Sequence, residues 1–102
     1  MEAQIFKALG DPLRLKIVKR LSHGSDYTIT TLTKDLGISR QGARKQLQVL
    51  ATAKVLRLKP VGREVNVILN PAALESCRRF IISLEQQWDT RLNALKDVVE
   101  RG

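Results

Sequence analysis

The stretch from residue 36 to residue 63 carries only positive charge. It contains no Asp or Glu, and its seven basic side chains are Arg40, Arg44, Lys45, Lys54, Arg57, Lys59 and Arg63. Apolar residues follow Ser39 at helical spacing, and two short segments of strand composition flank Gly62. The stretch therefore predicts a helix followed by the first strand and the turn of a β-hairpin, with no acidic group among residues 36–63. This combination constrains both the fold of the chain and the class of partner it can bind.

The net charge of the chain is unevenly distributed. The 102 residues carry +8 overall, with +4 in residues 12–23, +6 in residues 39–60 and zero in residues 70–102. A charge that served only solubility would be spread more evenly, so this concentration points to a polyanionic partner. The length predicts a single domain over residues 1–102.

Four helices are expected before the hairpin. Residues 3–9 form a short one, and Asp11 with Pro12 gives the cap-and-proline start of the second. Residues 23–26 read as a loop, and residues 27–29 as a short strand. Thr30 is the expected N-cap of the third helix, which Gly37 ends. Ser39 is the expected N-cap of the fourth, which runs to about residue 53.

The rest of the chain predicts two strands and a long helix. The strands cover residues 55–59 and 64–69, with a turn at residues 60–63, and the last helix covers about residues 71–100. The expected order is α-α-(β)-α-α-β-β-α. The fold class is thus mainly α with a small β-hairpin, which is a winged helix-turn-helix.

The fourth helix is expected to read DNA. Its apolar residues share one face, which leaves Arg40, Gln41, Arg44, Lys45 and Gln48 on the other. A helix exposed in this way fits a major groove about 12 Å wide, where Arg pairs with guanine and Gln with adenine. Arg63 lies at the expected tip of the hairpin, within reach of phosphate or the minor groove. The alternative is an amphipathic surface helix whose charges are merely solvated.

Several segments resemble the ArsR-type winged-helix repressors. Residues 8–17 read ALGDPLRLKI, similar to the opening "AL-x-DPTR-x-x-IL" of that family, and residues 36–50 are similar to its recognition-helix segment. Residues 55–56, 62–63 and 70–74 resemble its strand, wing and entry to the last helix. The sequence departs from the family at Arg44, where Ser is usual, and at Gln46, where His is usual. These departures leave the operator sequence open.

The resemblance implies a cytoplasmic prokaryotic transcription regulator, usually a homodimeric repressor that binds a palindromic operator in double-stranded DNA. It implies operator contacts from the recognition helix, a wing contact, and phosphate contacts near the start of the third helix. The DNA-binding residues expected on this basis are Thr30, Thr31, Ser39, Arg40, Gln41, Arg44, Lys45 and Arg63.

A metal site is not expected. By alignment with the family's Cys-x-Cys site, this chain has Thr28 and Thr30, and residues 70–74 contain neither Asp nor His. Zinc and softer metals need several Cys or His donors, and the chain has one of each. No cofactor is expected, and the sequence identifies no small-molecule effector. The position of Cys77 on the apolar stripe of the last helix predicts a small buried hydrophobe. A redox-sensing repressor that uses Cys77 stays open as an alternative, because two arginines follow it directly and could lower its pKa.

The last helix predicts a homodimer. Its apolar stripe is too long for a body of this size, so we expect about its first half to dock and the part from Trp88 onward to need a partner. Residues 71–100 are therefore the expected dimerisation helix, and residues from the first helix join it. The expected interface residues are Ile5, Phe6, Leu9, Leu84, Trp88, Leu92, Leu95 and Val99.

Other classes of protein fit less well. No catalytic triad, paired-carboxylate site or phosphate-binding glycine loop is visible, so an enzyme is not expected. A winged-helix protein-interaction module that has lost DNA binding is the main alternative, although such a module often carries acids on its recognition helix. No apolar run approaches the roughly 20 residues that span a bilayer. Met1 leads directly into an amphipathic helix rather than a signal peptide. We therefore expect a cytoplasmic protein with no membrane partner.

Overall fold

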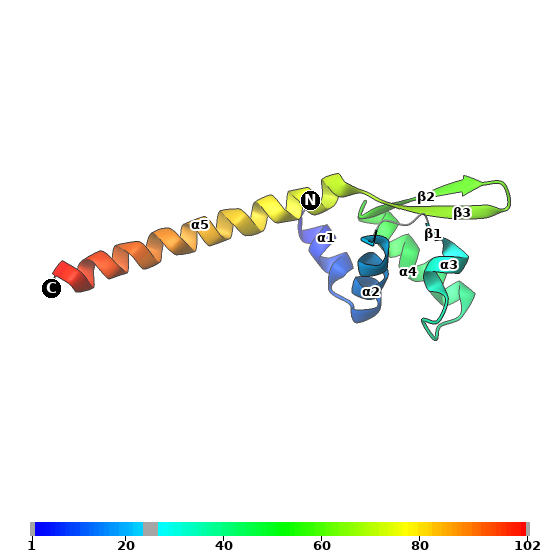
Figure 1. The fold of residues 1–102 in the computed structure, drawn as a ribbon, viewed down its shortest axis with the longest axis horizontal. Coiled ribbons are helices and arrows are strands. Elements are labelled where there is room, and N and C mark those ends of the chain that lie inside the picture. The colour runs from blue at the N-terminus through cyan, green and yellow to red at the C-terminus, as the bar shows by residue number, and fades with distance from the viewer. Residues whose placement is uncertain (1, 24–26, 102) are drawn as a thin grey trace.

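The computed structural model describes residues 2–23 and 27–101, and its elements follow the predicted order (Figure 1). The fold class is confirmed as mainly helical with a small antiparallel sheet. The elements are α1 (Glu2–Leu9), α2 (Pro12–Leu21), β1 (Tyr27–Thr28), α3 (Ile29–Thr33), α4 (Arg40–Thr52), β2 (Leu56–Val61), β3 (Glu64–Leu69) and α5 (Pro71–Arg101).

Two helix starts follow the predicted capping. The Asp11 carboxylate accepts hydrogen bonds from the backbone N–H groups of Leu13 and Arg14 at 3.0 and 3.1 Å, with Pro12 in the first helical position. The Ser39 hydroxyl accepts a bond from Gly42 N–H at 3.0 Å. Each cap satisfies backbone donors that have no partner within the helix. Both helices therefore begin where the sequence predicts.

An aliphatic core lies between the helices and the sheet. Ile17, Leu32, Leu47, Leu50 and Leu56 are almost completely buried in it, one or two from each of α2, α3, α4 and β2. Ala43 of α4 is also buried, whereas Ile38, which precedes α4, is half-buried. The core thus fixes α4 by its inner face and leaves its outer face exposed.

The third helix differs from the prediction at both ends. Its N-cap is Thr28, not Thr30, and it stops at Thr33 rather than at Gly37. The reason is a capping box in which the side chains of Thr28 and Thr31 each bond to the backbone of the other. The chain then turns through positive φ angles at Asp35 (66°) and Gly37 (70°).

The side chain of Arg20 holds this turn from α2. It donates to the carbonyl oxygens of Leu32 and Lys34 at 2.9 and 2.7 Å. These carbonyls lie at the end of α3, where helical acceptors have no partner of their own. Residues 24–26 of the predicted loop lie outside the described residues.

The hairpin is longer and tighter than predicted. Strand β2 continues through Pro60 to Val61, which pairs with Glu64, so the turn contains only Gly62 and Arg63. Gly62 has a φ of +61°, as the first position of a type II′ turn requires. Pro60 is tolerated because β2 is an edge strand in the order β1-β3-β2. The two-residue turn sets Arg63 at the outer end of a straight hairpin.

The last helix is continuous, but less of it docks than predicted. Its buried residues are Ala73 and Cys77, and the Phe80 ring contacts the Phe6 ring of α1 at a centroid distance of 5.7 Å. From Ile81 onward every described residue of the helix is exposed. The prediction that about half of it docks is therefore wrong, because the small body ends near Phe80. Figure 1 shows the rest of α5 projecting from the compact body. Because of this projection the molecule is 69 Å long but only 25 by 22 Å across.

Candidate nucleic-acid interface

The N-terminal half of α4 exposes polar and basic side chains on its outer face. Ala43, Leu47 and Leu50 bury the inner face. The exposed residues Gln41, Arg44, Lys45 and Gln48, with Ser39 at the cap, line a shallow surface groove of about 560 Å³. Four of the residues predicted to contact DNA therefore share one surface along the N-terminal half of α4.

A second hollow joins three elements of the fold. Thr30 from α3, Arg40 and Arg44 from α4, and Arg63 and Glu64 from the hairpin line a space of about 260 Å³. The Arg40 guanidinium donates to the Thr30 hydroxyl at 3.4 Å. Arg44 lines both the hollow and the groove along α4, so the two form one continuous basic surface.

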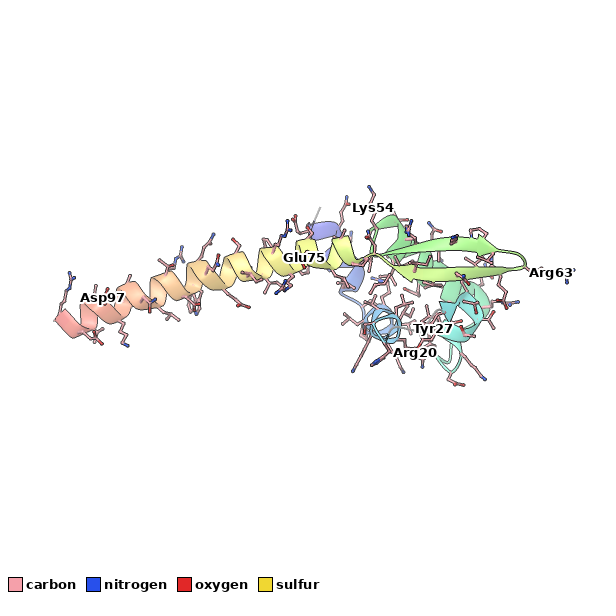
Figure 2. All side chains as sticks on the ribbon, turned by 45° about the horizontal axis from the view of Figure 1, so that its top comes forward. Arg20, Tyr27, Lys54, Arg63, Glu75 and Asp97 are labelled. Atoms are coloured by element: carbon pink, nitrogen blue, oxygen red, sulfur yellow. The ribbon has the colours of Figure 1, made fainter. Side chains whose placement is uncertain are left out.

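The hairpin carries the basic surface outward. Figure 2 shows Arg63 at the far end of the β2–β3 ribbon, away from the helices. Arg57 and Lys59 are exposed on the edge strand β2. Three cations on an extended ribbon can reach phosphates beyond the footprint of α4.

Thr31 does not join this surface in the predicted way. Its hydroxyl accepts a bond from Thr28 N–H at 2.9 Å and donates to the Thr28 carbonyl at 3.2 Å. The hydroxyl therefore maintains the N-terminus of α3, whereas the exposed Thr30 side chain lines the hollow. The difference follows from the cap at Thr28, which shifts the helix start by two residues.

Two residues of the surface were not among the predicted contacts. Gln48 lies four residues after Arg44, which places both on the same side of α4. Glu64 brings a carboxylate to the hollow beside the arginines. Helical spacing already places Gln48 on the polar face of α4, whereas Glu64 meets the arginines only through the pairing of β2 with β3.

The basic segment of α2 has a mostly structural role. Arg14 donates from Nε to the Ala8 carbonyl at 2.5 Å and from Nη1 to Gln46 Oε1 at 2.9 Å. Arg20 holds the end of α3 as described above. Lys16 and Lys19 are exposed. Half of the +4 charge of residues 12–23 therefore belongs to side chains that hold the helices around α4.

The environment of Cys77 does not activate its thiol. Burial raises the pKa of Cys77, and the Glu2 carboxylate raises that pKa further. Arg78 and Arg79, expected to lower it, instead form ion pairs with Glu75 at 3.5 Å on the exposed side of α5. That expectation is wrong, and a high pKa disfavours the thiolate that redox chemistry needs.

Possible metal ligands are dispersed over the described part of the chain. In residues 2–23 and 27–101, no three His, Cys, Asp or Glu side chains gather in a way that could hold a metal ion. Among the same residues, no helix is both long and apolar enough to cross a membrane.

Comparisons with known proteins agree with this arrangement. No family model matches the sequence. The chain is 30% identical to the HTH-type transcriptional regulator Rv2034 of Mycobacterium tuberculosis over 95 residues, which cover 93% of this chain and 85% of that protein. It is 27% identical to the transcriptional repressor SdpR of Bacillus subtilis, over 86% of this chain and 97% of SdpR.

A solved structure agrees in both fold and sequence. The ArsR-like transcriptional regulator from Rhodococcus sp. RHA1 superposes with a TM-score of 0.81 at 31% identity, over 95% of this chain and 91% of that one. The chain therefore belongs to the ArsR family of winged helix-turn-helix proteins and is a DNA-binding transcriptional regulator.

Proposed function

We propose that the protein is a homodimeric repressor that inserts α4 into the major groove of a palindromic operator and works without a metal site. The observation that carries the proposal is the hollow that unites Thr30, Arg40, Arg44 and Arg63 from three separate elements. Three arginines and one carboxylate, that of Glu64, line this hollow, so its net charge is positive and favours an anionic partner. Sugar-phosphate backbone beside a major groove supplies anions with this spread.

Within this proposal the residues have different roles. Gln41, Arg44 and Lys45 read base edges, because they lie on the exposed first two turns of α4. Ser39, Arg40 and Thr30 lie beside them and contact phosphates, and Arg63 contacts the flanking backbone or minor groove from the hairpin. Thr31 acts indirectly by holding the start of α3.

A second copy of the chain is the proposed partner of α5. The exposed part of the helix presents large apolar residues three or four positions apart, namely Ile81, Leu84, Trp88, Leu92, Leu95 and Val99. This stripe extends about 27 Å along the helix axis, which is more than a monomer commonly leaves in water. Flanking charges of both signs, including the Lys96–Glu100 pair at 4.0 Å, suit a copy of the same helix.

The first helix has a smaller part in this interface than the sequence predicts. Ile5 is 2% exposed and belongs to the core of the protomer, so it adds no surface to a dimer. Phe6 and Leu9 are half-buried and remain in the proposed interface, with Phe6 beside Phe80. A palindromic operator requires the two α4 helices to lie about 34 Å apart, one turn of DNA, and the proposed two-fold axis through the paired α5 helices must provide this spacing.

The proposed absence of a metal site rests on donor chemistry. The chain contains one Cys and one His, and the Cys is buried with a raised pKa. A metal-binding thiol must lose its proton, which this environment opposes. That the protein represses transcription is inferred from its similarity to the repressor SdpR. That it acts in the cytoplasm is inferred from the family, and both inferences are part of this proposal.

DNA titration at several salt concentrations tests this function. Purified protein is titrated onto random duplex and onto the DNA upstream of its own coding region. We expect a steep loss of affinity with salt and at least a ~10³-fold preference for one upstream site. Binding without preference would mean that the operator lies outside this upstream region or that specific binding needs a ligand. No binding at low salt would favour a protein-interaction module instead.

Paired variants make the test specific to α4. Arg44→Ala should weaken specific binding by about 5- to 150-fold, because one base contact contributes ~1–3 kcal/mol. Arg101→Ala removes the same charge at the far end of α5 and serves as the matched control. Equal effects of the two substitutions would show that only net charge matters and would contradict the assignment of α4.

A further inference from the structure

A groove between α1 and the C-terminal half of α4 is not explained by DNA binding. It has a volume of about 580 Å³, within the range of small-molecule sites in proteins. Ala8, Val49 and Ala53 supply its apolar lining. Val49 is 40% exposed, although it lies on a helix whose other large apolar side chains are buried. Covering this exposed apolar surface with an apolar ligand removes it from water, which is favourable.

The rim of the groove is positively charged. Lys7 from α1, Arg14 from α2 and Lys45 from α4 line it, and none of the described residues that line it is Asp or Glu. The guanidinium of Arg14 is held in place by its bonds to the Ala8 carbonyl and to Gln46. An apolar floor with a cationic rim suits a ligand that has a hydrocarbon chain and one anionic group.

The groove is compatible with the proposed dimer. At 100° per residue, Gln4, Lys7 and Ala8 occupy one side of α1, while Phe6 and Leu9 occupy the opposite side. Phe6 faces α5 through its contact with Phe80. Pairing of two protomers through α5 therefore uses the other side of α1 from the groove.

Two residues belong to both the groove and the DNA-facing surface. Lys45 and Gln48 line this groove and also line the surface with Arg44 and Gln41. A Lys45 ammonium that pairs with a ligand anion is no longer available to the operator. A ligand in the groove and DNA on α4 are therefore expected to oppose each other's binding, by the same factor in both directions.

We propose that the groove between α1 and α4 is an effector site for a small amphiphilic carboxylate, whose binding weakens operator affinity through Lys45. The hydrocarbon chain lies on Val49 and Ala53, and the carboxylate faces Lys7 and Lys45. The regulatory half of this proposal rests on the proposed function, whereas the binding half does not.

Decanoate is a suitable probe and is titrated first without DNA. Backbone amide shifts should change at α1 and the C-terminal half of α4, and the affinity should fall about fourfold per methylene from decanoate to nonanoate to octanoate. Decylamine, which is cationic at neutral pH, has a similar chain and should bind at least about tenfold more weakly. Equal affinity of the cation, or shifts confined to the apolar stripe of α5, would overturn the proposal.

Two substitutions test the two halves of the site separately. Lys7→Glu reverses the charge at the rim, and Val49→Gln removes the apolar floor, so each should weaken decanoate binding about tenfold. Lys16→Glu makes the same charge change on the exposed side of α2 and is the matched control. Circular dichroism and the melting temperature check that each variant is folded. Unchanged decanoate affinity in both folded variants would place the ligand elsewhere.

DNA competition tests the coupling. Decanoate should lower the DNA affinity of the Lys16→Glu protein and of the unmodified protein, and it should leave Lys7→Glu unaffected over the same concentration range. Decanoate that binds the groove without changing DNA affinity would overturn the regulatory half. The DNA titration without decanoate tests the proposed DNA-binding surface on its own. If that surface is wrong, the protein does not bind DNA even before decanoate is added.

Discussion

Replacement of Trp88 by Ala tests how the exposed part of α5 is covered. Trp88 is 59% exposed in the protomer. A Trp side chain offers up to about 250 Å², so about 150 Å² of it is left for a partner to bury. At ~25 cal/mol per Å², complete burial contributes about 4 kcal/mol per protomer and about 7 kcal/mol per dimer.

These values are upper limits on the measured effect. The Ala that remains keeps part of the contact, and interfaces convert area into affinity incompletely. We therefore expect Trp88→Ala to raise the dimer dissociation constant by at least ~100-fold, which corresponds to about 3 kcal/mol. Sedimentation equilibrium over a range of protein concentrations measures this constant directly.

The control uses the opposite side of the same helix. Gln86 lies about 160° around α5 from the middle of the apolar stripe, so Gln86→Ala should leave the dissociation constant unchanged. Circular dichroism at a concentration where the protein is dimeric reports whether α5 stays helical in both variants. If the Trp88→Ala protein stays helical and its dimer dissociation constant lies within threefold of the value for the unmodified protein, burial of this residue in a dimer is refuted.

Three further predictions concern other parts of the molecule. Arg63→Ala should weaken binding to operator and to random DNA by similar factors and should reduce the dependence of affinity on salt, both of which fluorescence anisotropy measures. Weaker binding to the operator alone would contradict a contact with the DNA backbone. Asp11→Ala removes two capping bonds and should lower the free energy of unfolding by ~1 kcal/mol, or about 4–8 °C in melting temperature, whereas no change would mean that α2 starts equally well without its cap. The raised pKa of Cys77 means that the folded protein keeps the thiol protonated, so stability from this group is present below about pH 9 and declines as the pH rises through the folded pKa. Native Cys77 should react with a disulfide reagent at pH 8 much more slowly than the same chain in urea, and equal rates would contradict its burial.

Local chemistry made much of the fold predictable. The caps at Asp11 and Ser39 and the positive φ at Gly62 depend on residues within a few positions of each other, and each lies where the sequence indicates. Thr28 and Thr30 were equally good caps by composition. The choice between them follows from the side chain of Thr31, which completes a capping box only with Thr28.

Long-range features could not be predicted in the same way. Apolar spacing identifies the face of α5 but not the extent of the body that covers it, so the docked part was overestimated. The charge of Arg14 is visible in the sequence, whereas its bond to Gln46, 32 residues away, exists only once the helices pack. The groove between α1 and α4 has the same origin, because its lining comes from three separate helices.

The length of the unpaired part of α5 has a consequence for how the protein responds to its own abundance. The proposed pairing through α5 brings two α4 helices together in one dimer. Where monomers predominate, the concentration of this DNA-binding dimer rises with the square of the chain concentration. Operator occupancy then rises more steeply than the amount of protein synthesised. Substitutions along the apolar stripe of α5, far from the DNA, would therefore change the expression level at which the promoter is repressed.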